Sequence, residues 1–396
     1  MKTLVVIAAG AADRPQDELG GRTPLEAAQT PALDRLAREG RLGRLTPAPA
    51  GLRPEEGVHA LAMFGLDPAA HPEIGAALDA AAFDVTPGSL DQVFRLSLVT
   101  AHEDTIFDPT AGHVSREEAV LLLEALSEGI ADPDLVFLPG DGWRNLLLWR
   151  GARDVRVKTV PPYELVGRSV KAALPRGTGT ARLVAAVAKS GDLLPGHEVN
   201  ECRSDLQENP ATLAWAWCPG VATALPSFQT RTGARAALVG VDPAFVGAAK
   251  LQGIEVVRVE GATGTVTTNF RAKCDAALTA LSTHDLVFLH VGAAAEASHS
   301  RDFVAKVEAI ERLDGYVIAP AIRELEARGD ARILVTSGEA VAVDSGRHLA
   351  DDVPFVLFGP GVRSHRGTGF SELASREGGF LVERAHELLD FVLHFA

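Results

Sequence analysis

Ionisable side chains follow two apolar runs that have the character of buried strands. Residues 2–8 form a continuous run rich in β-branched residues, and the loop that breaks it carries Asp13 and Arg14. Residues 285–291 form a second such run, and His299 follows it. An open α/β sheet places its binding sites just beyond the carboxyl ends of parallel strands. These two loops are therefore the first places where we expect a site.

Further apolar runs indicate the sheet that must position these side chains. Strands are predicted at 236–240, 255–259 and 332–336, with helical lengths of chain between them. Residues 30–40 predict a helix over the first strand, because Pro31 stands at a first-turn position and a glycine ends the pattern. The predicted fold class is α/β, with a mostly parallel sheet that is covered on both faces.

Residues 70–195 have a different character. The apolar pattern predicts strands at 93–100, 135–138 and 145–149 and a helix over 117–127. On that helix, the leucines expected on the buried side are Leu121, Leu122, Leu123 and Leu126. We interpret this segment as a smaller α/β or α+β lobe inserted into the main domain. The expected domains are a discontinuous core of residues 1–69 and 196–396, and the inserted lobe of residues 70–195.

Composition excludes several classes of partner. A formal net charge of -14 argues against nucleic acid or an anionic membrane surface. No apolar run reaches the roughly 18 residues of a spanning helix, and no signal-peptide pattern stands at the N-terminus. The cysteines, Cys202, Cys218 and Cys274, show no CxxC spacing and are expected to be small buried hydrophobes. We therefore expect a soluble cytoplasmic protein of 396 residues.

Three motifs near the N-terminus carry a resemblance to a known family. They are Asp13-Arg14-Pro15, the segment Gly20-Gly21-Arg22-Thr23-Pro24-Leu25-Glu26-Ala27-Ala28, and Thr30-Pro31-Ala32-Leu33-Asp34-Arg35-Leu36-Ala37. The chain resembles the archaeal-type, cofactor-independent (2,3-bisphosphoglycerate-independent) phosphoglycerate mutases of the alkaline phosphatase superfamily. The resemblance implies a core sheet of alkaline-phosphatase type, a lobe that covers the substrate, two bound metal ions and a nucleophilic serine. It also implies glycolytic isomerase activity.

The motif positions that hold metal and nucleophile in that family are mostly changed here. The first strand ends Asp-Gly-x-x-Asp-Arg-Pro in the family, and its first Asp, a metal ligand, corresponds to Ala9. Counted back from Gly65, the nucleophilic serine falls on Glu56. The remaining ligand positions, in motif order, are Ala295, His299, Gly338, Glu339 and His348, of which only the two histidines match.

The resemblance also implies a set of basic residues for the phosphate and carboxylate of the substrate. The matching positions are Arg95, Arg144, Arg203 and Lys273. A further family segment, Asp-Arg-x-Ala-Gly-Arg, reads Asp108-Pro109-Thr110-Ala111-Gly112-His113 and so lacks both arginines. The chain therefore has fewer basic residues for the phosphate and carboxylate of the substrate than the family pattern has.

These changes lead to three hypotheses. The first is a catalytically degenerate homologue without a cofactor, which retains at most the binding of a phosphorylated or carboxylated small molecule between its lobes. The alternative is an active phosphoglycerate mutase or related phosphotransferase with a rearranged site for one divalent ion, Mn or Zn, formed by Glu56, Glu339, His299 and His348. The third is a purely structural subunit.

Overall fold

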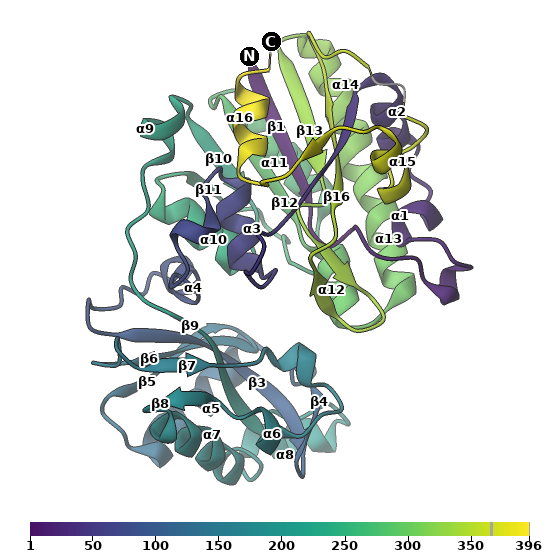
Figure 1. Ribbon diagram of the computed structural model, residues 1–396. Coiled ribbons are helices and arrows are strands. Elements are labelled where there is room, and N and C mark those ends of the chain that lie inside the picture. Colours follow the sequence, from purple (N-terminus) through teal and green to yellow (C-terminus); the bar gives the residue numbers. More distant parts are fainter. Residues whose placement is uncertain (365–366, 396) are drawn as a thin grey trace. The chain divides into compact units, whose positions relative to one another are not determined.

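The computed structural model describes residues 1–364 and 367–395. The chain divides into two compact units, which are shown in Figure 1. The larger unit comprises residues 1–71 and 225–396, and the smaller unit comprises residues 72–224. The smaller unit runs past the expected boundary at residue 195, because β9 (Leu213–Gly220) pairs with β3 (Gln92–His102) inside it.

The larger unit is built on an eight-stranded sheet in the order β11-β10-β12-β1-β13-β16-β2-β17. Strand β1 (Lys2–Ala8) lies between β12 (Leu286–Val291) and β13 (Ala331–Thr336) and pairs with both in parallel. It is buried on both faces, as its continuous apolar run predicts. The other predicted strands are β10 (Ala236–Val239) and β11 (Glu255–Val257).

Three strands of this sheet have no counterpart in the sequence prediction. Strand β16 (Val353–Phe358) is antiparallel to both of its neighbours, β13 and β2 (Arg41–Leu45), and β17 (Leu381–Val382) is a two-residue edge strand. A separate hairpin, β14 (Ala340–Ala342) with β15 (Arg347–Leu349), stands beyond the carboxyl end of β13.

Helices complete the larger unit (Figure 1). Helices α2, α11 and α14 pack around the π-helical turn that joins α13 to α14, and α3 contacts α10 and α16. Their bounds are η1 Asp17–Leu19, α1 Pro24–Ala27, α2 Pro31–Glu39, α3 Glu56–Met63, η2 Pro68–Ala70, α9 Phe228–Thr232, α10 Pro243–Leu251, α11 Phe270–Ala280, α12 Ala293–His299, α13 Phe303–Leu313, η4 Asp314–Ile318, α14 Ala319–Arg328, α15 Glu372–Glu377 and α16 Glu387–Leu393.

The smaller unit is an antiparallel sheet in the order β4-β3-β6-β5, with β9 on β3. Its bounds are α4 Ala77–Ala82, β4 Thr105–Asp108, α5 Arg116–Ile130, β5 Leu135–Asp141, β6 Arg144–Trp149, β7 Arg156–Lys158, η3 Pro162–Leu165, α6 Val170–Ala173, β8 Arg176–Thr178, α7 Ala181–Leu193 and α8 Glu198–Asp205. The expected α/β class, with a mostly parallel main sheet and a smaller second unit, is confirmed.

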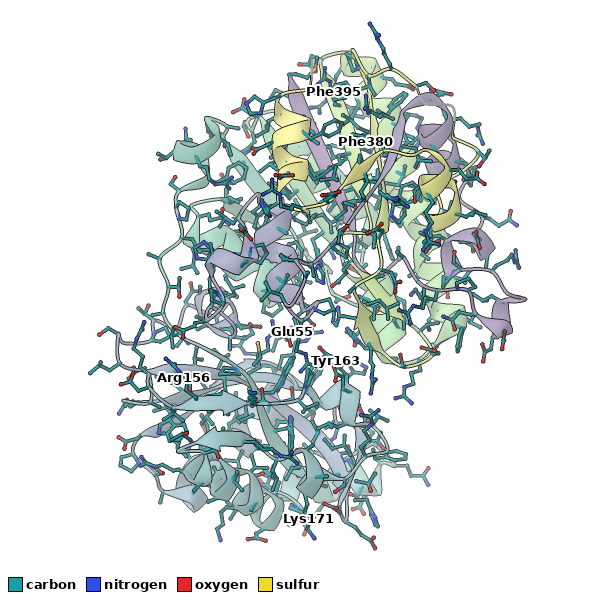
Figure 2. The ribbon with its side chains drawn as sticks, viewed as in Figure 1. Glu55, Arg156, Tyr163, Lys171, Phe380 and Phe395 are labelled. Carbon is teal, nitrogen blue, oxygen red and sulfur yellow. The ribbon has the colours of Figure 1, made fainter. Side chains whose placement is uncertain are left out.

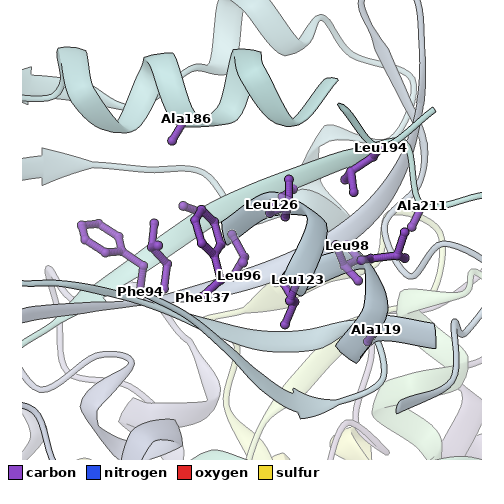
Figure 3. Close-up of a cluster of buried hydrophobic side chains, with 14 of the residues drawn as sticks. Phe94, Leu96, Leu98, Ala119, Leu123, Leu126, Phe137, Ala186, Leu194 and Ala211 are labelled. Carbon is purple, nitrogen blue, oxygen red and sulfur yellow. The ribbon is translucent and has the colours of Figure 1, made fainter. Parts of the chain in front are cut away.

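Helices α5 and α7 cover one face of the smaller sheet. The core between these helices and the sheet contains Phe94, Leu96 and Leu98, which are alternate residues of β3, as Figure 3 shows. From α5 it receives Leu122, Leu123 and Leu126, as expected, but Leu121 is 44% exposed. The prediction for Leu121 is wrong, because a run of consecutive leucines exceeds the width of one helix face.

Within residues 1–364 and 367–395, no helix combines the length and the apolar character that crossing a bilayer requires.

One buried ion pair ties distant parts of the larger unit together. Lys306 Nζ lies 2.7 Å from Asp13 Oδ2, and both side chains are fully buried. The same ammonium donates to the Val341 carbonyl at 2.6 Å, and Val343 N–H donates to Asp13 Oδ2 at 3.0 Å. Burial lowers the pKa of Lys306, and Asp13 opposes that effect. The pair therefore fixes the loop after β1 against β14.

Replacing Lys306 with Met should lower the free energy of unfolding by about 3–5 kcal/mol, because it leaves the Asp13 carboxylate buried without its cation. Urea denaturation followed by circular dichroism measures the change. The matched control is Arg271→Met, which breaks the exposed Arg271–Asp275 pair and should cost less than about 1 kcal/mol. Equal losses in the two variants would contradict the anchoring role of Lys306.

Candidate metal centre

Five ionisable side chains of the larger unit meet in one cluster, which we call the His348 cluster. Its members are Glu56, His59, His299, Glu339 and His348. They come from two helices, α3 and α12, from the turn before β14 and from β15. The structure therefore brings together all four residues of the predicted one-ion site and adds His59.

Helix α3 supplies Glu56 and His59. The backbone of Glu55 is extended (φ −126°, ψ 159°), so the helix begins at the next residue, and Figure 2 labels Glu55 at this point. Glu56 and His59 are separated by three positions, which places them on the same helix face. The sequence analysis missed His59, although the Glu-x-x-His spacing is itself a signal for a helical pair of ligands.

Helix α12 ends at His299. Its Nδ1 lies 2.9 Å from the carbonyl oxygen of Gly346, which can only accept a hydrogen bond. Nδ1 therefore carries the proton, and Nε2 is left with its lone pair, as a metal ligand requires. Burial lowers the pKa of His299, and the nearby His348 lowers it further.

The hairpin β14–β15 supplies the other two members. Glu339 directly precedes β14, and His348 stands opposite Val341 in the β14–β15 pairing. Glu339 Oε2 lies 3.0 Å from His348 Nδ1 and 3.3 Å from His59 Nε2. The side chain of Glu339 is 5% exposed and that of His348 is 3% exposed.

Mutual attraction outweighs burial in this pair. Burial alone would raise the pKa of Glu339, but His348 and His59 lower it to about 2. Burial would likewise lower the pKa of His348, but Glu339 and Glu56 raise it to about 10. For His59 burial prevails, and its pKa is lowered. Without an ion, Glu339 and His348 are thus both charged at neutral pH, and an ion bound at His348 Nε2 would displace the proton there.

The outer part of the cluster fits a divalent ion. Glu56, His299 and His348 each offer a ligand atom, and these atoms all lie within 4.8 Å of one another. His348 Nε2 lies 3.6 Å from Glu56 Oε1. Two imidazoles and one carboxylate are a ligand set that zinc adopts in proteins. The hydrogen bonds that His348 donates to Glu339 and that His299 donates to the Gly346 carbonyl match the outer contacts that orient metal-bound histidines.

The other positions at which the family has metal ligands carry no metal-binding side chain in this protein. Ala9 and Ala295 are joined by a backbone hydrogen bond of 3.0 Å, and both side chains are methyl groups. The backbone there is close-packed, since a Cβ on Gly10 would lie 2.5 Å from the Ala295 Cα. Gly338 has φ +69°, which favours glycine. In the part of the chain that the structure describes, side-chain ligands for two separate family-type ions are therefore not assembled.

Arg95 and Arg144 share one face of the smaller sheet. In the pairing of β3 with β6, Ser97 is opposite Arg144, and Arg95 lies two residues from Ser97 on the same face. The Arg95 guanidinium lies 2.9 Å from the Asp79 carboxylate and stacks over Trp217. This face is opposite the one that α5 covers.

Arg203 and Lys273 lie elsewhere. Arg203 is 4% exposed on the helix-covered side of the smaller unit, where it binds Glu118 at 2.9 Å and the carbonyl of Ala111 at 2.9 Å. Lys273 belongs to the larger unit, is fully buried and donates to the Thr263 carbonyl at 2.8 Å. Sequence position alone gave no sign of this burial. Of the four predicted basic residues, Arg95 and Arg144 lie on one face of the smaller sheet by strand register, and Arg203 does not lie on that face.

Comparisons with known proteins agree with the motifs. The family described as 2,3-bisphosphoglycerate-independent phosphoglycerate mutase matches residues 37–200. A Geobacter sulfurreducens protein named as a probable mutase of this kind is 36% identical, over 99% of this chain and 100% of the relative. A mutase of Methanothrix thermoacetophila is 34% identical, with the same coverage. A solved Pyrococcus horikoshii structure has a TM-score of 0.77 and 26% identity, over 99% of this chain and 97% of that one.

The chain therefore belongs to the 2,3-bisphosphoglycerate-independent phosphoglycerate mutase family. The family inferred from the motifs is confirmed over nearly the full length. The comparisons give no support to the first hypothesis, a loss of catalysis, and they favour the alternative of an active enzyme.

The free energy of unfolding should rise with pH between about 8 and 10.5 because of the buried Lys273. Burial lowers the pKa of this lysine from 10.5 to about 8, so the unfolded chain binds more protons than the folded chain in that window. Lys273→Met should remove this rise, which amounts to about 3 kcal/mol for the 2.5-unit shift. Urea midpoints at pH 7.5 and 10 measure it, with exposed Lys189→Met as the control. Parallel pH profiles of the wild type and Lys273→Met would refute the assignment.

Proposed function

We propose that this chain is a metal-dependent phosphoryl-transfer enzyme of the phosphoglycerate mutase family that works with one divalent ion, Zn or Mn, at Glu56, His299 and His348. The observation that carries the proposal is the convergence of these three ligands within 4.8 Å of one another. The ion would supply Lewis-acid stabilisation of the charge on a transferring phosphoryl group.

The protein side chains of this site have separable roles. His299 and His348 are held by the Gly346 carbonyl and by Glu339, so their rings are oriented in advance. Glu56 offers a carboxylate whose side chain is 20% exposed and so remains accessible from solvent. Because Glu56 stands where the family has its serine, a phosphoserine cannot form at this position. The phosphoryl acceptor is then a hydroxyl of the substrate or a water molecule.

We further propose that Arg95 and Arg144 bind the anionic groups of a phosphorylated, carboxylated small molecule of the phosphoglycerate type. The two residues share one sheet face by strand register, the Arg144 guanidinium stacks over Trp143, and guanidinium matches both carboxylate and phosphate in geometry. Arg95 is held by Asp79 and Trp217, which restricts its side chain before any ligand binds.

A second candidate function is binding without catalysis. It is favoured by the family positions at Ala9, Ala295 and Gly338, which have no ligand atom in their side chains, and by the carboxylate of Glu56 in place of a hydroxyl. Losing one such charge-stabilising group typically costs about 3 kcal/mol of transition-state stabilisation. The two candidates agree on the arginines and differ on the ion and on turnover.

The metal content tests the first candidate directly. Protein purified without chelator and titrated with Zn²⁺ or Mn²⁺ should bind one ion per chain by calorimetry. His299→Ala and His348→Ala should each weaken binding at least tenfold, because each removes one of three ligands. His284→Ala, which removes a buried histidine outside the cluster, is the control and should bind as the wild type does.

The same preparations decide between the two candidates. Interconversion of 3-phosphoglycerate and 2-phosphoglycerate, or release of phosphate from them, that requires the ion supports phosphoryl transfer. Ion binding without any turnover supports the second candidate. A wild-type chain that binds no ion would overturn the metal centre.

The arginine pair predicts weak, salt-sensitive binding of 3-phosphoglycerate. Ligand binding should raise the melting temperature in a concentration-dependent way, and Arg144→Met should weaken the apparent affinity at least threefold. Arg150→Met, on the same unit, is the control, because its guanidinium is exposed and contacts the Pro133 carbonyl. An Arg144→Met variant with wild-type affinity would remove this residue from the proposal.

A further inference from the structure

We propose that His59 is a positioning residue for the metal centre. It holds the Glu339 carboxylate against Nδ1 of His348 and thereby keeps Nε2 of His348 turned toward Glu56. The inference rests on the proposed one-ion function, which it deepens by naming a residue that sets how tightly the ion is held.

One carboxylate oxygen lies between two imidazole rings. Glu339 Oε2 lies 3.3 Å from His59 Nε2 and 3.0 Å from His348 Nδ1. The two rings are stacked, with centroids 6.0 Å apart and planes at 25°. A carboxylate oxygen with a ring on each side has little room to rotate, so the hydrogen bond that it accepts from His348 has a fixed direction.

The burial of His59 needs an explanation beyond packing. Its side chain is 1% exposed, and among the described residues its ring nitrogens make no hydrogen bond of standard geometry, although the Pro47 backbone and Glu339 both oppose the lowering of its pKa. Burying an apolar side chain at this point of α3 would cost less free energy, since an unsatisfied buried polar group costs about 1–3 kcal/mol. The benefit that offsets this cost is the approach of Nε2 to the buried Glu339 carboxylate.

The position of His59 on α3 also fits this role. Glu56 lies one turn earlier on the same face, so one rigid helix carries an ion ligand and the group that orients another ligand. Glu56 and His59 therefore keep a fixed spacing from one another on one rigid element.

A second arrangement uses the same atoms. His59, Glu339 and His348 also lie close enough to bind an ion of their own. This set shares His348 with the outer set, so ion binding at the inner set would make His59 a ligand and not a positioning residue. The number of bound ions separates the two arrangements.

The experiment uses the full chain with His59→Phe and His59→Gln. Phenylalanine keeps an aromatic ring of similar shape and removes the nitrogens, whereas the glutamine amide can still donate to Glu339. The matched control is His284→Phe, because His284 is 6% exposed and its Nε2 lies 3.2 Å from Glu255 in a comparable pair outside the cluster. Where Phe prevents folding, His59→Asn, whose shorter amide does not reach Glu339, takes its place.

Two readouts are needed. In the metal-free protein, ¹⁵N-histidine NMR measures the exchange rate of the Nδ1 proton of His348, which the bond to Glu339 should protect. In calorimetry and visible spectroscopy, Co²⁺ serves as the probe for affinity, number of ions and ligand geometry. We expect His59→Phe to speed proton exchange and to weaken Co²⁺ binding 10- to 100-fold, still with one ion per chain. His59→Gln should recover most of both effects, and His284→Phe should change neither.

Wild-type exchange and wild-type Co²⁺ affinity in His59→Phe would overturn the inference. Two ions in the wild type that fall to one in His59→Phe would overturn it too, since His59 would then be a ligand. A wild type that binds no Co²⁺, Zn²⁺ or Mn²⁺ overturns the proposed ion site. In that case faster exchange at His348 in His59→Phe still supports the positioning of this ring.

Discussion

The buried pair of Asp13 and Lys306 is the contact on which the candidate centre depends. Lys306 reaches from α13 to the loop after β1 and to the carbonyl of Val341, and Val341 stands opposite His348 in the β14–β15 hairpin. The hairpin is only three residues long on each side and is too small to be stable alone. The ion pair, and the hydrogen bond that Val343 N–H donates to Asp13, anchor the hairpin to the loop after the central strand β1. The ring of His348 is therefore placed by a charge pair that is not itself part of the ligand set.

A second buried charge pair then sets the chemistry of the cluster. Glu339 and His348 remain charged because each compensates the burial of the other. The adjacent side of the site is closed by contact between backbones, at Gly10 and Ala295, where the family ligand positions hold only methyl groups. The metal-binding side chains of this site are thus concentrated around His348. That distribution favours one ion, whereas the family pattern divides its ligands between two.

Much of the larger unit could be predicted because β1, β12 and β13 are continuous apolar runs, a pattern that does not depend on distant partners. Strand β16 could not be recognised in this way because Pro354 stands inside its apolar run, and β17 could not because it has only two residues. At the site, the resemblance to the family implied Glu56, His299, Glu339 and His348 as the residues of the alternative one-ion hypothesis. It could not identify His59, whose role depends on a carboxylate 280 positions away in the chain. It also could not show that Arg203 is buried, with its guanidinium bound to Glu118 and the Ala111 carbonyl. Burial follows from packing and not from residue type.

The candidate groups belong to two separate units of the chain. All members of the His348 cluster belong to the larger unit, so ion binding requires the fold of that unit alone. Arg95, Arg144 and their partners belong to the smaller unit, so anion binding there can survive without an ion. Phosphoryl transfer requires the ion, because a bound cation stabilises the charge of the transferring group. The family fold alone does not decide between catalysis and binding, and that choice depends on whether the ligands around His348 hold an ion tightly enough to act on a bound substrate.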